Sequence, residues 1–432
     1  MKKLLITLFI CLLFIPCLYA EEGGDDPALI EFVSDEDLLE KQKKPFGIDD
    51  RFFELGLMKT EVVVSNNYLT IGEIFSKTLL LNIDNLRDGL QVSVGADVTP
   101  LYFNFNSHKG WGFGMSVLKL DAAGIFGLSG KILSLSEARD EKTEFSGALY
   151  ASTEISGFFQ IQKFKVKVKP ALYYTMAYIR PNIKYTFENT SEGDRFFIDY
   201  EVFVHTAFPM ENFPNQFSLT GTPGFDFSVG VEYPLSKELG LNEIIPFLDF
   251  DVGLDFINIP IVSSTTKDYM RLRGTIGSRD PFYIIDQDKE GSGEGDGGLG
   301  GVFKHNPEKT IYDESVMRIE RPFKMLVSAN WRPLLGSRLL TITPVLGFSL
   351  SPIYLQPVGF EGGVNATVNI VNMFIVTAGI NYFDRVWINS LDFGLNFRAV
   401  QLDIGVDMRS QDFIKSWTAG GAGVRIGLRF GW

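Results

Sequence analysis

Cysteine is nearly missing from this chain. Its 432 residues include two cysteines, Cys11 and Cys17, and both lie close to the N-terminus. We expect that end to be removed, which would leave no cysteine for a disulfide, a zinc cluster or a thiol nucleophile. We therefore expect a chain that folds without cross-links, binds no metal and needs no cofactor.

Long apolar runs are missing as well. Beyond residue 20, no segment reaches the roughly 18 consecutive apolar residues of a membrane-spanning helix, which excludes a helical membrane protein. Positive charge is also in short supply. Without Lys2 and Lys3 the chain has 38 basic against 53 acidic residues, a net charge of −15. This balance disfavours nucleic acid as a partner.

Histidine is scarce, and its positions do not indicate catalysis. His108, His205 and His305 have no serine or acidic partner at a recognised spacing. The chain also lacks a Gly-x-Ser-x-Gly elbow and a His-Glu-x-x-His helix. We therefore expect no enzymatic activity.

The first 20 residues have the pattern of a secretory signal peptide. Two lysines precede an apolar run at 4–15, and Ala20 is a small residue at the expected cleavage point. The run is too short to span a bilayer and ends at Pro16, which disfavours a membrane anchor. Lipidation at Cys17 is disfavoured because bulky residues precede it. We expect export, with residues 1–20 removed.

Apolar and polar residues alternate with period two through most of the remaining chain, which predicts β-strands. The clearest segment is 247–257, where every second residue is apolar. In several segments the polar side is charged, and we take those residues as candidates to face the interior of a barrel. They are Lys163, Lys165, Lys167 and Lys169 in one segment, Asp249, Asp251 and Asp255 in a second, and Asp403 and Asp407 in a third.

The pattern predicts about 14 strands, and up to 16, within residues 51–432. Residues 21–50 are acidic and polar and are expected to be a flexible N-terminal segment. Residues 68–88 have helical spacing and predict a short helix or plug, and 287–301 form a glycine-rich loop. Further loops are expected at 137–142, 188–194 and 209–223. The expected strands lie at roughly 51–64, 88–106, 111–128, 143–160, 163–179, 196–207, 224–233, 246–257, 268–276, 316–331, 338–350, 358–371, 373–384, 388–398, 400–409 and 421–432.

Each expected strand has one apolar face, and in water a lone sheet of this kind would need a second layer to cover it. In lipid no second layer is needed, but every backbone group must be paired, so only a closed barrel can span. Aromatic residues make up 13% of the chain and gather near strand ends, as in interfacial girdles. We therefore predict an all-β, closed, antiparallel transmembrane barrel in contact with outer-membrane lipid.

The C-terminus resembles the signal that the barrel-assembly machinery recognises in outer-membrane proteins. That signal has a polar residue, a glycine and two aromatic residues separated by one position at the end of the chain. The matching residues are Arg425, Gly427, Phe430 and Trp432. The resemblance implies that this machinery is a partner and that the location is the cell outer membrane.

Taken together, these features resemble outer-membrane barrels of the FadL-type long-chain fatty-acid transporter superfamily and their spirochaetal relatives. The Asn-Pro-Ala sequence often found near the N-terminus of that family is absent from residues 21–90, so no ligand-binding residue is carried over. The resemblance implies uptake of a small or hydrophobic solute or lipid. The alternative is a structural or interaction barrel, an adhesin or secretion-associated protein without transport activity.

Overall fold

The fold was examined in a computed structural model. It describes residues 52–68, 89–107, 110–133, 138–191, 193–209, 219–245, 247–282, 305–307, 311–334, 339–354, 357–371, 373–397, 399–418 and 420–431. Contacts divide the chain into two units, Met1–Pro45 and Phe46–Trp432. The expected signal peptide, the acidic segment and the glycine-rich loop lie outside the described residues, and they stay predictions. Within the described part, no helix has the length and apolarity to cross a membrane.

Fourteen strands form a closed antiparallel ring. Each strand pairs with its neighbour along the chain or across an insertion, and the last strand pairs with the first. In ring order they are β1 (Phe53–Asn66), β2 (Leu90–Asn106), β3 (Trp111–Leu128), β5 (Glu144–Ile161), β6 (Phe164–Thr190), β8 (Gly224–Tyr233), β9 (Phe250–Val262), β13 (Phe323–Trp331), β14 (Leu340–Leu350), β15 (Val358–Ile370), β16 (Phe374–Phe383), β17 (Val386–Phe397), β18 (Val400–Ser410) and β19 (Gly421–Gly431).

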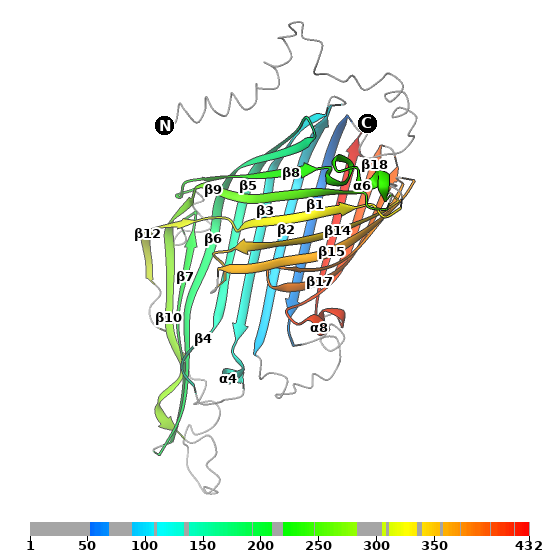
Figure 1. The fold of residues 1–432 in the computed structure, drawn as a ribbon. Coiled ribbons are helices and arrows are strands. Elements are labelled where there is room, and N and C mark those ends of the chain that lie inside the picture. The colour runs from blue at the N-terminus through cyan, green and yellow to red at the C-terminus, as the bar shows by residue number, and fades with distance from the viewer. Residues whose placement is uncertain are drawn as a thin grey trace. The chain divides into compact units, whose positions relative to one another are not determined.

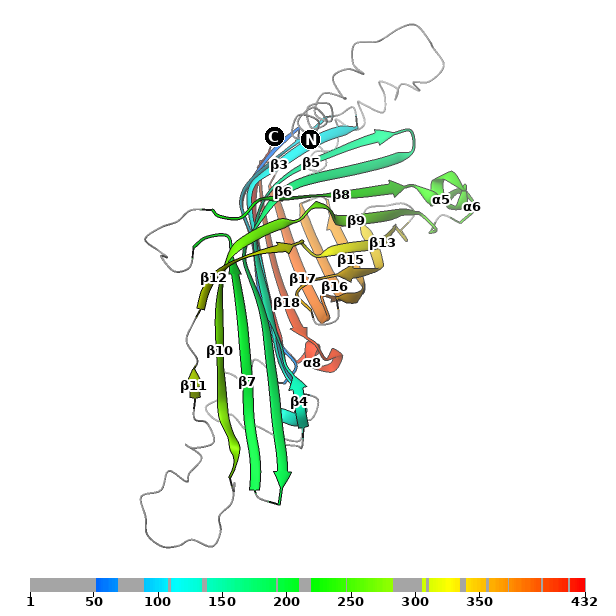
Figure 2. The same cartoon turned by 90° about the vertical axis from the view of Figure 1, so that its left-hand side faces the viewer.

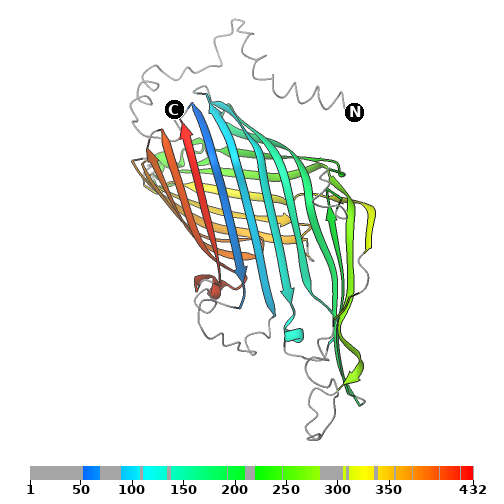
Figure 3. The same ribbon diagram turned by 180° about the vertical axis from the view of Figure 1, so that it is seen from behind.

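The ring closes where the two ends of the described chain meet. Strand β19 lies beside β1, with Glu54 opposite Gly431 and Ser65 opposite Gly421 (Figure 3). This closure removes the open sheet edge that an exposed strand would present. The all-β antiparallel barrel expected from the sequence is confirmed, and the ring holds the expected 14 strands.

Side chains alternate between the two faces of the wall. One row crosses β17, β18 and β19 through Leu391, Val406 and Val424, which are 38%, 48% and 48% exposed. The neighbouring positions on the other face are charged or small, and they belong to the interior of the ring. The barrel is therefore inverted relative to a water-soluble protein, with apolar side chains outside and ion pairs inside.

The two rims differ in the length of their connections. At the rim that holds Phe53 and Gly431, four connections are between two and four residues long, such as 162–163 and 398–399. Short helices α5 (Leu235–Glu238) and α6 (Leu241–Ile244) also lie there. The opposite rim carries α4 (Gly130–Leu133), α8 (Phe413–Trp417) and the longest connections. One elaborated rim is the usual asymmetry of outer-membrane barrels.

On one side the wall bends sharply and continues beyond the ring as an extension. Strands β8, β9 and β13 lie above the bend, and β7 and β10 run down from it (Figures 1 and 2). The extension pairs the second half of β6 with β7, β7 with β10, and β10 with β12. Its five strands are β4 (Ala138–Lys142), β7 (Gly193–Thr206), β10 (Ser264–Phe282), β11 (His305–Pro307) and β12 (Ile311–Ile319).

The sequence pattern did not predict this bend. One strand expected at 316–331 is broken at residues 320–322 into β12 and β13, and the strand expected at 163–179 continues to Thr190. An expected loop at 188–194 is reduced to a turn between Thr190 and Gly193. The loop expected at 137–142 contains β4 instead. All four differences lie in the extension, because its strands prolong those of the ring.

A β-bulge at Met176 lies at the level of the bend. Leu149 pairs with Ala177 and Tyr150 pairs with Thr175, so Met176 is the extra residue in β6. A bulge of this kind bends its strand and shifts the alternation of side chains by one position. Tyr173 faces inward before it, and Tyr178 faces inward after it.

Candidate functional site

Hydroxyl side chains replace the missing ladder bonds at the bend. The edge of β6 changes partner there, from β8 up to Tyr173 to β7 from Ala177 onward. Ser264 Oγ accepts a hydrogen bond from the backbone N–H of Thr175 at 3.0 Å and donates one to the carbonyl oxygen of Thr222 at 3.1 Å. A buried backbone group without a hydrogen-bond partner costs free energy. The Ser264 hydroxyl supplies such a partner at the bend, where the pairing between strands is interrupted.

Ser264→Ala is expected to destabilise the folded protein by about 1–3 kcal/mol, because the buried backbone N–H of Thr175 loses the hydroxyl that accepts its hydrogen bond, whereas the carbonyl oxygen of Thr222 keeps the N–H of Thr265. Ser264 is fully buried. The measurement is urea unfolding of protein refolded in lipid vesicles, followed by heat-modifiable gel mobility. Ser263→Ala is the matched control, because that hydroxyl donates to Glu320 at the surface and its loss should cost under about 0.5 kcal/mol. If the two changes destabilised the protein equally, Ser264 would have no special role in hydrogen bonding to the backbone at the bend.

A buried ion cluster occupies the inner side of the bend. Arg321, at the corner between β12 and β13, binds Asp226 with two nitrogens at 2.8 and 2.7 Å. Its third nitrogen binds Glu154 at 2.9 Å, and Glu154 also binds Lys169 at 3.1 Å. The guanidinium lies 5.3 Å from the centre of the Tyr173 ring. We call Arg321, Asp226 and Glu154 the corner cluster.

An apolar cluster lies beside the corner cluster and reaches across the interior. Tyr150, Tyr173 and Tyr178 from β5 and β6 pack with Ile319 and with Ile353, which belongs to the turn after β14. The tyrosine hydroxyls donate to the carbonyl oxygens of Glu320, Ile319 and Pro352 at 3.1, 3.1 and 2.9 Å. The turn that begins at Ser351 is therefore bound to the opposite wall, so the interior is bridged at this level.

Farther around the ring, ion pairs form a ladder on the inner face. Arg425 of β19 binds Asp392 of β17 across β18, with Nε to Oδ1 at 2.9 Å. Gly405 lies between them, and a Cβ there would collide with the Asp392 carboxylate. Glycine at this position thus permits a salt bridge between strands that are not neighbours. The same ladder contains Arg409 with Asp407 and Glu61, and Arg429 with Asp403.

The charged residues singled out from the sequence fall into four groups in the structure. Asp403 and Asp407 belong to the ladder described above. Lys165 and Lys167 pair with Glu232, Lys169 pairs with Glu154 of the corner cluster, and Lys163 pairs with Glu238 of α5. Asp249 and Asp251 both bind Arg332. Asp255 packs beside Gly230 of the neighbouring strand. Their role in selecting a solute stays a prediction.

Asp249 and Arg332 lie outside the strands, at the rim with the short turns. Arg332 Nε donates to Asp249 Oδ2 at 2.8 Å, and Nη1 donates to Asp251 at 2.7 Å. The hydrogen bonds from Arg332 hold the pKa of Asp249 below its ordinary value. This carboxylate therefore stays ionised in mildly acidic solution and keeps the ends of β9 and β13 tied together.

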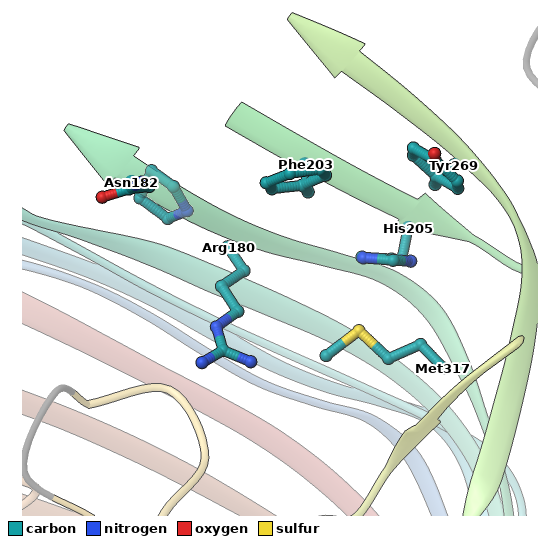
Figure 4. A pocket seen from close by; sticks show the side chains of 7 residues that line it. Arg180, Asn182, Phe203, His205, Tyr269 and Met317 are labelled. Carbon is teal, nitrogen blue, oxygen red and sulfur yellow. The ribbon is translucent and has the colours of Figure 1, made fainter. Parts of the chain in front are cut away.

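A cavity of about 320 Å³ opens on the inner face of the extension. Its lining comes from three long strands and from β12, and the labelled side chains surround one space in Figure 4. Met317 lines this cavity and also packs against the apolar cluster, which connects the two. The main lining residues are Arg180, Asn182, Phe203, His205, Tyr269 and Met317.

Sequence reasoning missed most of this site. The sequence pattern indicates no catalytic role for His205, and it does not single out Arg180, Phe203 or Tyr269. The one available signal was the alternation of Phe203 and His205 along one strand. Among the described residues, no group of three or more histidine, aspartate, glutamate or cysteine side chains could hold a metal ion.

Comparisons with known proteins give structural neighbours only. No protein-family model and no curated protein matches the chain. The toluene transporter TodX from P. putida matches at 8% identity and a TM-score of 0.46, over 89% of this chain and 90% of that one. The Ralstonia pickettii toluene transporter TbuX matches at 9% and 0.41, over 90% and 91%. The CymD monoaromatic hydrocarbon channel matches at 9% and 0.42, over 88% and 89%.

These three neighbours are hydrocarbon transporters of the FadL family, the family that the sequence features resemble. Because their TM-scores lie below 0.5, they say nothing about the solute of this chain. A solute has to be argued from its own residues.

Proposed function

We propose that this protein is an outer-membrane channel that takes up small solutes with an apolar, aromatic body. The observation that carries the proposal is the cavity on the extension, which is lined by Phe203, His205 and Tyr269 at the rim with the long connections. In outer-membrane barrels the long loops face the outside of the cell. The cavity would therefore be the first binding site that an incoming solute meets.

The apolar and charged faces of the barrel, and the apolar side chains next to the cavity, favour transport over a purely structural role. Its outer face carries the apolar belt that lipid would cover, and its inner face carries ion pairs. The apolar cluster begins where the cavity ends, since Met317 belongs to both. An aromatic solute thus finds continuous apolar contacts from the rim to the level of the bend. A water-filled general pore would need no such lining.

The test is uptake of radiolabelled toluene by intact bacterial cells that carry the protein in their outer membrane. Uptake should exceed that of cells with the empty vector, and Phe203→Ala combined with Tyr269→Ala should reduce it by at least about fivefold, because each buried ring contributes about 1 kcal/mol or more to binding. Surface amounts of both proteins are matched by gel mobility of the folded form. Uptake equal to the vector would contradict the channel and favour the interaction barrel.

A further inference from the structure

The bulge at Met176 determines which side chains reach the cavity. After the bulge, Tyr178 faces inward, and every second residue along β6 follows it, so Arg180 and Asn182 share its face. In an uninterrupted strand Ile179 and Pro181 would hold that face. Arg180 lies opposite Phe203, and Tyr178 lies opposite His205. An arginine is thus placed beside a group of rings.

Three rings form one wall of the cavity. The His205 and Tyr269 ring centres are 5.6 Å apart, Phe203 and Tyr269 are 6.1 Å apart, and Phe203 and His205 are 6.5 Å apart. They come from two paired strands, β7 and β10, so their spacing is held by the backbone ladder. A flat six-membered ring can lie against such a wall with offset or edge contacts.

The two arginines near Phe203 are not equivalent. Arg271 lies over the Phe203 ring and is neutralised by Glu201, with Nε to Oε1 at 2.6 Å. Within the described part of the chain, the Arg180 side chain has no ion pair or hydrogen bond. Its guanidinium therefore remains available to an anion, which it would bind through two parallel hydrogen bonds.

His205 supplies a second, independent sign of a ligand. The residue is 8% exposed, and among the described residues its Nδ1 atom has no hydrogen-bond partner. Buried polar atoms in folded proteins normally have a partner. A ligand seated in the cavity would bring a polar group within reach of this ring and would cover the apolar side chains around it.

We propose that this cavity binds a monoaromatic carboxylate, with the ring against Phe203, His205 and Tyr269 and the carboxylate on Arg180. The inference rests on the proposed function, because it names the solute class of that channel. A neutral hydrocarbon would leave Arg180 without a partner, and an aliphatic acid would leave the rings uncovered. Aromatic ring and negative charge are both needed.

The test is isothermal titration calorimetry of the full mature chain in lipid nanodiscs, with benzoate, benzyl alcohol and acetate as probes. Benzoate should bind at least about tenfold more tightly than benzyl alcohol, which keeps the ring and loses the charge, and acetate should not bind measurably. Arg180→Gln should weaken benzoate at least about tenfold and leave benzyl alcohol unchanged, whereas Phe203→Ala should weaken both. Lys184→Gln removes the same charge farther along β6, outside the cavity lining, and should change neither.

Equal affinities for benzoate and benzyl alcohol, or no effect of Arg180→Gln, would overturn the proposal. Arg180→Lys keeps the charge without the two parallel donors and should fall between the wild type and Arg180→Gln, which a merely structural role would not produce. The two proposals fail separately. Toluene uptake without a preference for benzoate overturns the carboxylate site alone, and benzoate binding without any uptake overturns the channel alone.

Discussion

Arg321→Met is expected to destabilise the folded protein by about 3–5 kcal/mol, because the change leaves Asp226 buried without a cation and removes one of the two cations that pair with Glu154. The side chains of the three residues are 3%, 2% and 10% exposed. Lys169 still faces Glu154, but among the described residues no cation other than Arg321 pairs with Asp226. The measurement is urea unfolding in lipid vesicles, followed by heat-modifiable gel mobility.

Two further variants test whether the loss of stability in Arg321→Met comes from buried charges without a partner or from the substitution of a charged residue in general. Lys163→Met removes a pair with Glu238 in which the lysine is 59% exposed, and it should cost under about 1 kcal/mol. Replacing the whole corner cluster, Arg321→Met with Asp226→Leu and Glu154→Met, should recover most of the loss, since the three buried charges are removed together and Lys169, which loses Glu154, is 35% exposed to water. If the triple variant were less stable than Arg321→Met, the cluster would owe its effect to packing.

Val406→Arg is expected to cost about 2–4 kcal/mol and to slow insertion into vesicles, because the residue lies at the middle of β18 on the outer face. Arginine there would have to enter hydrocarbon. The same urea unfolding measures the change, with the yield of folded protein after vesicle insertion as a second reading. Val406→Leu keeps the position apolar and should cost under about 1.5 kcal/mol.

Depth along the wall supplies the control for this prediction. Phe397→Arg lies at the end of β17 near the short-turn rim and should cost about 0–1 kcal/mol, since a charge at the interface remains hydrated. A difference between the two positions is expected only if lipid covers the belt. If both changes were neutral and the chain stayed soluble without detergent, the outer face would be in water and the channel proposal would fail with it.

The ring and the polarity of its faces follow from the sequence alone. In 400–410, apolar Leu402, Ile404 and Val406 alternate with Asp403 and Asp407, and period two assigns the two sets to opposite faces. Counting such alternating segments along the chain gives the expected number of strands. In lipid every backbone group must be paired, so a sheet of such strands can span only as a closed barrel.

The partners of the charges required the tertiary structure. Arg321, Asp226 and Glu154 are far apart in the sequence, and no local pattern indicates that a strand corner folds into the interior. The ion pair from Arg425 to Asp392 depends on Gly405 in the strand between them. Such contacts depend on which strands are neighbours and on their register, and a one-residue slip would rearrange all of them.

The sequence by itself determined that this chain forms a barrel with an apolar outer face and a charged inner face, because alternation is a local property of each strand. The tertiary structure alone decided the bend, the extension and the cavity. Residues 171–179 are apolar or aromatic at nearly every position, so the sequence does not indicate which of them share a face of the strand. A bulge at Met176 therefore cannot be recognised from the pattern. That one extra residue turns Arg180 toward the rings, because each added residue reverses the face of every side chain that follows.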